Sequence, residues 1–293
     1  MAASKGASRL ERLRGLASAP DEQARYAARL LETETNTEVA RAALEVLKAR
    51  DADELRTALV DAYKHRDARG VRRDPGGALR TAILQALRPL ARHEDVPLLE
   101  RAASTYEFLF GEAAGDLRAA ALLLLNDLDD ALAGYHAVRL LADKHTDIMS
   151  GEPAATAVRV LASQNQLLPL YAYVMRDSME PGTSDVLAES LRCLSSLPAS
   201  LLPAVMGKYG ETEDEIVLLG LFDLLMARED RVAHTPFILS FLRNTPLLNI
   251  YRYLVSVLVA SRDEDVLAEL QMMSDSEEDR HKAEILREAL ALR

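Results

Sequence analysis

Residues 115–128, GDLRAAALLLLNDL, have the spacing of apolar side chains that predicts a buried helix. Leu117, Ala120, Leu124 and Leu125 are three, four and one residues apart, so a helix with about 3.6 residues per turn places them on one face. Related segments occur before and after this one. Because the pattern recurs, the chain is predicted to consist of repeated helical units.

Leucines at matching positions mark these units. Aligning VARAALEVL at 39–47, LRTAILQAL at 79–87 and LRAAALLLL at 117–125 matches the small residues Ala42, Ala82 and Ala120. The marker leucines of these and four later segments are Leu47, Leu87, Leu125, Leu161, Leu194, Leu225 and Leu258. Their separations of 40, 38, 36, 33, 31 and 33 residues suit two helices and two turns per unit. The sequence therefore predicts a stack of helix pairs, a solenoid.

The predicted helices form one continuous domain with three parts, 1–35, 36–275 and 276–293. An N-terminal pair covers 8–17 and 21–33, the first repeat begins with a helix at 37–50, and a capping helix covers 277–292. Second helices of the repeats are predicted at 53–64, 95–104, 130–143, 167–176, 200–209, 235–243 and 265–273. Thr35 with Glu38, and Thr212 with Glu215, have the spacing of capping boxes at helix starts.

Several of the first helices have a small residue and, four and five residues later, Leu or Val and then Leu. This pattern resembles that of the HEAT-repeat family. The 31 to 40 residue spacing and the acidic turns at Asp51, Asp95, Asp129 and Asp263 add to the resemblance. Family members often pair a turn Asp with an Arg about six residues later, and here Asp95 with Arg101 fits. The resemblance implies an all-α, right-handed α–α superhelix of HEAT or armadillo type. It would hold about seven helix pairs plus terminal caps, with the second helices along the concave face.

Composition narrows the function classes. Trp is absent and only 5% of residues are aromatic, which favours helix over sheet in a chain that is 49% hydrophobic. The net charge of -11 disfavours nucleic acid as a partner. Residues 1–146 hold 22 basic and 23 acidic side chains, whereas 147–293 hold 13 and 23. The single cysteine, Cys193, excludes an internal disulfide and favours the cytoplasm, and no apolar run approaches the roughly 20 residues of a membrane span.

Two sets of residues are candidates for binding a partner. The connection 64–80 contains Lys64, Arg66, Arg69, Arg72, Arg73 and Arg80, which could clamp an acidic partner or a phosphate. The alternative is a solvated loop whose arginines cap the preceding helix end. On the second helices, a groove is predicted from Tyr135, Arg139, Tyr171, Arg176, Lys208 and Tyr209.

Other clusters have structural and functional interpretations side by side. Tyr106, Phe108 and Phe110 either anchor a partner or pack under the adjoining loop. Carboxylates at 211–215, 263–265 and 275–279 either stabilise helix starts or dock a basic partner. Cys193 aligns with Leu124 and Val160 and is expected in the core. The six histidines show no metal-ligand spacing, and the sequence predicts no catalytic residue, cofactor or metal.

These observations favour a non-enzymatic scaffold or adaptor that presents a concave helical surface to a protein or peptide partner. A basic segment would approach the acidic half 147–293, and an acidic one the connection 64–80. One alternative is a HEAT-like enzyme similar to phycobilin lyases or alkylpurine DNA glycosylases, families whose resemblance lies in fold alone. Another is a regulatory subunit whose activity resides in its partner.

Overall fold

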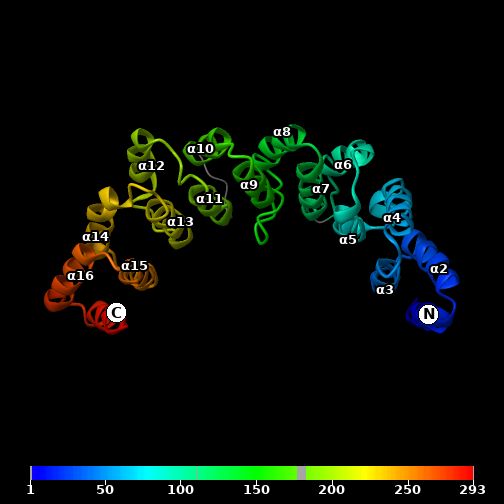
Figure 1. Cartoon of the computed structure of the whole chain (residues 1–293), viewed down its shortest axis with the longest axis horizontal. Coiled ribbons are helices and arrows are strands. Elements are labelled where there is room, and N and C mark those ends of the chain that lie inside the picture. The colour runs from blue at the N-terminus through cyan, green and yellow to red at the C-terminus, as the bar shows by residue number, and fades with distance from the viewer. Residues whose placement is uncertain (1, 110, 177–182, 293) are drawn as a thin grey trace. The chain divides into compact units, whose positions relative to one another are not determined.

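The computed structural model describes residues 2–109, 111–176 and 183–292. Within these residues the chain is all-α, with seventeen α-helices joined by turns and short 3-10 helices, and no strand (Figure 1). The chain divides into two compact units, unit 1 (1–166) and unit 2 (167–293). The predicted all-α class is therefore confirmed.

Unit 1 contains the first nine helices. They are α1 (Ala2–Gly15), α2 (Pro20–Thr33), α3 (Thr37–Lys48), α4 (Ala52–Asp67), α5 (Ala78–Leu87), α6 (Val96–Ala103), α7 (Gly115–Leu128), α8 (Asp130–Leu141) and α9 (Ala154–Ser163). Figure 1 shows α3, α5, α7 and α9 in one layer, on the inner side of the curve of this unit, and α4, α6 and α8 in a second layer outside it. The concave placement expected for the second helices is therefore wrong for unit 1.

Unit 2 contains the remaining eight helices. They are α10 (Leu167–Met175), α11 (Ser184–Arg192), α12 (Leu202–Tyr209), α13 (Glu215–Met226), α14 (Thr235–Asn244), α15 (Leu248–Ala260), α16 (Glu264–Ser276) and α17 (Arg280–Ala291). Within this unit α11 packs on α13, α13 on α15 and α15 on α17, so these four also form a layer.

The marker leucines all lie in the cores of their units. Their exposed fractions range from 0% to 3%, and the four apolar residues that predicted the 115–128 helix are at most 5% exposed. Burial of such side chains stabilises each unit by roughly 25 cal/mol per Å2 of apolar surface removed from water. Leu194 is buried although α11 ends two residues before it. The predicted helices recur in the structure within about three residues of their expected bounds, except that α1 begins six residues before the expected start at residue 8.

The helix starts correct two details of the sequence analysis. Asn36, not Thr35, caps α3, because its side chain accepts hydrogen bonds from Glu38 N and Val39 N. Likewise Asp214, not Thr212, caps α13. Asp51, Asp129, Asp263 and Asp279 cap α4, α8, α16 and α17 in the same way. The capping boxes were wrong because Asn and Asp side chains compete successfully for the same amides.

The turn residue Asp95 does not pair with Arg101, contrary to the sequence expectation. Its carboxylate instead receives two hydrogen bonds from Arg56 Nη2, at 2.8 and 2.9 Å, and Arg101 lies 3.6 Å from Asp67. The partner therefore comes from the preceding repeat, 39 residues earlier, so this ion pair links α4 to the start of α6.

A recurring contact ties helix ends to later helices. Six cations of the described residues each donate hydrogen bonds to main-chain carbonyls 31 to 40 residues earlier, at or just beyond a helix C-terminus. These carbonyl-capping cations are Arg66, Arg73, Arg139, Lys208, Arg228 and Lys282. The last carbonyls of a helix lack partners within it and carry partial negative charge, so a cation is well suited to them. Their sequence reach equals the spacing of the marker leucines.

Candidate functional site

The connection 64–80 is an ordered part of unit 1, built from two short 3-10 turns. Arg66, 1% exposed, donates to Leu31 O at 2.7 Å and Glu34 O at 2.8 Å, and Arg73 donates to Thr33 O. These two arginines cap the end of α2 and not that of the preceding helix, α4, so the structural alternative was right that the arginines cap a helix but wrong about which helix. Burial of Arg66 also lowers the pKa of its guanidinium and leaves that group unavailable to a partner.

Arg80 is the second buried cation of this connection. It pairs with Asp74 at 3.1 Å and with Glu107 at 2.5 Å, and all three side chains are at most 5% exposed. Burial opposes the charge on Arg80, but its hydrogen bond to Glu107 and the surrounding carboxylates outweigh burial and raise its pKa. Arg69 contacts His65, and only Lys64, Arg69 and Arg72 remain as exposed cations of the predicted clamp.

The second predicted set divides between the units. Tyr135, 79% exposed, and Arg139 lie on α8 in unit 1, where Arg139 donates to Ala103 O. In unit 2, Lys208 and the hydroxyl of buried Tyr209 both donate to Val174 O. Arg176 lies 4.1 Å from the ring of Tyr173, and Tyr171 is half-buried. Several of these groups therefore have structural contacts, and a continuous groove through both units stays a prediction.

The remaining sequence candidates also have defined surroundings. Phe108 is 61% exposed and meets His145 edge-on, while Tyr106 donates to Asp143 at 2.9 Å. Phe110 lies outside the described residues. Cys193, directly after the last residue of α11, is half-buried rather than in the core, and burial raises the pKa of its thiol. The part of the chain that the structure describes contains no cluster of three or more potential metal ligands.

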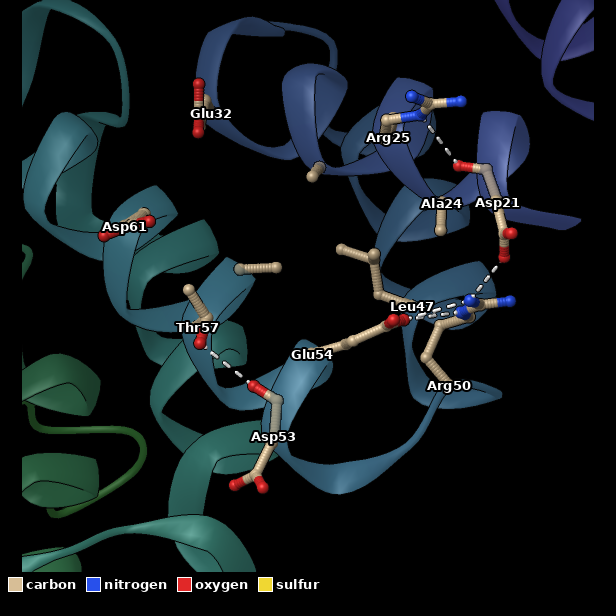
Figure 2. Close-up of a pocket in the computed structure, with 12 residues that line it drawn as sticks. Asp21, Ala24, Arg25, Glu32, Leu47, Arg50, Asp53, Glu54, Thr57 and Asp61 are labelled. Carbon is tan, nitrogen blue, oxygen red and sulfur yellow. Dashed lines mark hydrogen bonds and ion pairs between the residues drawn. The ribbon is translucent and has the colours of Figure 1, made fainter.

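Unit 1 has a groove between α2 and α4, which we call the α2/α4 groove (Figure 2). It has a volume of about 760 Å3, in the range of ligand-binding clefts. Its apolar floor is formed by Ala24, Ala28, Leu47 and Ala58. Neither the sequence motifs nor the charge balance of the chain halves pointed to it.

Carboxylates outnumber cations among the side chains that line this groove. The acidic residues are Asp21, Glu32, Asp53, Glu54 and Asp61, and the basic ones are Arg25 and Arg50. Arg50 lies 2.8 Å from Asp21 and 3.0 Å from Glu54, and hydrogen bonds to these carboxylates raise its pKa. The ion pairs of Arg50 with Asp21 and Glu54 lie at one end of the groove (Figure 2).

Glu32 and Asp61 lie at the opposite end of the α2/α4 groove (Figure 2). Neither carboxylate has a hydrogen bond or ion pair with the residues that the structure describes. Asp53, at the α4 start, is already paired with Arg92 at 2.6 Å. The groove therefore offers two uncompensated negative charges beside an apolar floor, and its net charge suits a cationic ligand.

One signal in the sequence could have led to this groove. Glu54 and Asp61 are seven residues apart, two helical turns, and so share a face of the predicted 53–64 helix. Recognising the groove also required knowing that α4 packs on α2, and helix periodicity alone does not supply that pairing.

Comparisons with models of protein families, with curated proteins and with solved structures found no match. Among the described helices, none combines the length and the apolar character needed to cross a membrane.

Proposed function

We propose that the protein is a non-enzymatic interaction scaffold or adaptor that binds a basic segment of another protein in the α2/α4 groove. The observation that carries the proposal is the combination of an apolar floor with a carboxylate-rich rim in one 760 Å3 groove. Charge complementarity of this kind speeds encounter and selects among partners. The single cysteine supports a cytoplasmic location for this role.

The partner segment is an amphipathic helix with Lys or Arg along one side. Two helices, α2 and α4, form the walls of the groove, and a third helix can place small or branched apolar side chains against Ala24, Ala28 and Ala58. Its cations then reach Glu32 and Asp61, which gain partners without breaking an existing ion pair.

A direct test uses a fluorescent 18-residue peptide of Lys, Leu and Ala with helical periodicity, and the same peptide with Glu in place of Lys. We expect the basic peptide to bind with an affinity that falls as salt rises, and the acidic peptide not to bind. Anisotropy measured against protein concentration gives both affinities.

Matched variants locate the binding surface. The double variant Glu32→Gln with Asp61→Asn should lower the affinity for the basic peptide by about tenfold, which is roughly the contribution of one or two charge-assisted contacts. Glu11→Gln with Glu229→Gln removes the same net charge from exposed positions outside the groove and should leave the affinity unchanged. Equal losses in both variants would show a nonspecific charge effect and contradict the proposal.

We further propose that the helix pairs of both units continue one right-handed α–α superhelix of HEAT or armadillo type. The carbonyl-capping cations and marker leucines support it, because both repeat along the chain with the same 31 to 40 residue reach. A compact globule of this length has a radius of gyration near 19 Å. Small-angle scattering should give a clearly larger value, and a value at or below that of a globule would refute the superhelix.

A further inference from the structure

A smaller pocket lies between the C-terminal half of α4 and α6. Its volume is about 380 Å3, and its walls include Ala68, Pro97 and Leu98. The charged lining residues are Lys64, Asp67, Glu94 and Arg101. None of these residues lines the α2/α4 groove, so the pocket is a separate feature of unit 1.

Tyr63 lines this pocket and carries an unpaired polar atom. The side chain is 1% exposed, yet its hydroxyl has no hydrogen-bond partner among the described residues. The charged groups that act on this hydroxyl include Asp67 and Arg101, both of which line the pocket. Burial raises the pKa of Tyr63, so the phenol stays protonated and keeps a proton to donate. A buried hydroxyl without a partner is costly, so an acceptor supplied by a ligand would stabilise it.

The carboxylates of the pocket are already matched with arginines. Glu94 lies 2.5 Å from Arg56, and the two oxygens of Asp67 lie 3.7 Å from Arg80 and 3.6 Å from Arg101. These acids therefore do not call for a cationic ligand.

The cations of the pocket are less fully engaged. Arg101 is 74% exposed, and its guanidinium donates no hydrogen bond within the described residues, where it makes a long ion pair with Asp67 at 3.6 Å. Lys64 is exposed and, in the same described part of the chain, has neither a hydrogen bond nor an ion pair. The groups with unused hydrogen-bonding capacity, Tyr63, Lys64 and Arg101, are thus all donors, and the last two are positively charged.

We propose that this α4/α6 pocket binds a single carboxylate carried on a small branched apolar group. The carboxylate accepts hydrogen bonds from Tyr63 and Arg101, with Lys64 at the rim, while the apolar group packs against Pro97 and Leu98. A dianion such as phosphate is disfavoured by Asp67 and Glu94, which line the same small space. The carboxylate can belong to a free organic acid or to the C-terminus of a peptide.

The experiment uses calorimetric titration of the full chain with four probes. They are 4-methylpentanoate, its neutral isostere 4-methylpentanamide, the peptide acetyl-Gly-Gly-Leu with a free C-terminus, and the same peptide amidated. We expect each acid to bind at least about tenfold more tightly than its amide, because only the acid offers charged acceptors. Inorganic phosphate should not compete. Tighter binding of the peptide acid than of 4-methylpentanoate identifies a peptide terminus as the ligand, and the reverse order identifies a free acid.

Variants separate binding from folding. Tyr63→Phe should lower the affinity for the acid by about tenfold. The melting temperature should stay the same or rise, because the variant removes a hydroxyl that has no hydrogen-bond partner among the described residues of the free protein. Arg101→Gln should also weaken binding, whereas Arg72→Gln removes an exposed guanidinium outside the pocket and should not.

Three results would each overturn the proposal. They are equal affinity for acid and amide, an unchanged affinity in Tyr63→Phe, and no heat of binding with any probe at about 10 mM, a concentration that would detect even weak association. Binding of the basic 18-residue peptide to the α2/α4 groove is measured independently, so failure here leaves that result intact.

Discussion

Buried charges in unit 1 are held by small networks of defined geometry. Arg118, 0% exposed, donates to Glu112 at 2.8 Å and to Thr105 O at 2.9 Å. The other oxygen of Glu112 accepts from the main-chain amides of Glu107 and Ala114. Burial opposes the charge on Glu112, but the hydrogen bonds from Arg118 and these amides outweigh burial and lower its pKa.

The depressed pKa of Glu112 predicts an acid-dependent loss of stability. A carboxylate whose folded pKa lies below its unfolded value stabilises the fold above the unfolded pKa, and that contribution disappears as pH falls through the folded pKa. Glu112→Gln should therefore cost about 3 kcal/mol near pH 7, as expected for breaking a buried pair, and progressively less below about pH 4. Urea unfolding of both proteins from pH 7 to pH 3 measures this. A constant difference across that range would contradict the assignment, and Glu11→Gln provides the exposed control.

The carbonyl-capping role of Arg66 gives a second prediction. Arg66→Met preserves much of the apolar stem but leaves Leu31 O and Glu34 O without their donors, so we expect a loss of about 2–4 kcal/mol. Arg72→Met, at an exposed position of the same connection, should change stability by less than about 0.5 kcal/mol. Thermal unfolding followed by circular dichroism compares the two, and similar melting temperatures would show that the buried hydrogen bonds contribute little.

At the scale of helices, α13 packs closely against α11 at Gly220. A β-carbon there would lie 2.5 Å from Ala188 Cα and 2.7 Å from Ala188 O, which is closer than atoms tolerate without a backbone shift. Gly207 on α12 has nothing within 4 Å of the same position among the residues described. The two glycines therefore form a matched pair within unit 2.

Gly220→Ala and Gly207→Ala should have opposite effects. Alanine gains roughly 0.5–1 kcal/mol over glycine inside a helix, so Gly207→Ala should raise the melting temperature. At Gly220 the collision with main-chain atoms exceeds that gain, and we expect a net loss of about 1–3 kcal/mol. Melting curves of the two variants test the close packing of α11 and α13, and a stabilised Gly220→Ala would contradict it.

At this scale, most of what could be predicted from the sequence came from helix periodicity. The 3.6-residue pattern located the helices and the buried marker leucines because both depend on local spacing. It misassigned the caps of α3 and α13 by one or two residues, since several Asn, Asp and Thr side chains there compete for the same amides. The role of Arg66 was also hidden, because its acceptors lie 32 and 35 residues away in the chain.

The candidate sites depended on tertiary pairing that the sequence did not reveal. An even charge balance over 1–146 concealed the acidic α2/α4 groove, because the arginines of this half are largely engaged in ion pairs or in capping carbonyls. Similarly, nothing in the sequence marks the hydroxyl of Tyr63 as unpaired.

At the scale of the whole molecule, each unit has its own apolar core. Leu124→Asp places an unpaired charge at a position of α7 that is 1% exposed, in the core of unit 1, and should cost more than about 4 kcal/mol. Hydrogen exchange should then accelerate in α5, α7 and α9, while α11, α13 and α15 keep their protection because their core is built within unit 2. Equal loss of protection in both units would show that they unfold as one.

The carbonyl-capping cations make the joins between repeats tolerant of length. A β-ladder fixes its strands residue by residue, whereas Arg and Lys carry their donors on long, rotatable stems that reach over a variable distance. Contacts spanning 31 residues at Arg228 and 40 at Lys282 use the same chemistry. If a turn in such a chain gained or lost a residue, the Arg or Lys side chain would still reach its carbonyl. The connections between repeats are therefore the positions at which a whole repeat is most easily inserted or removed.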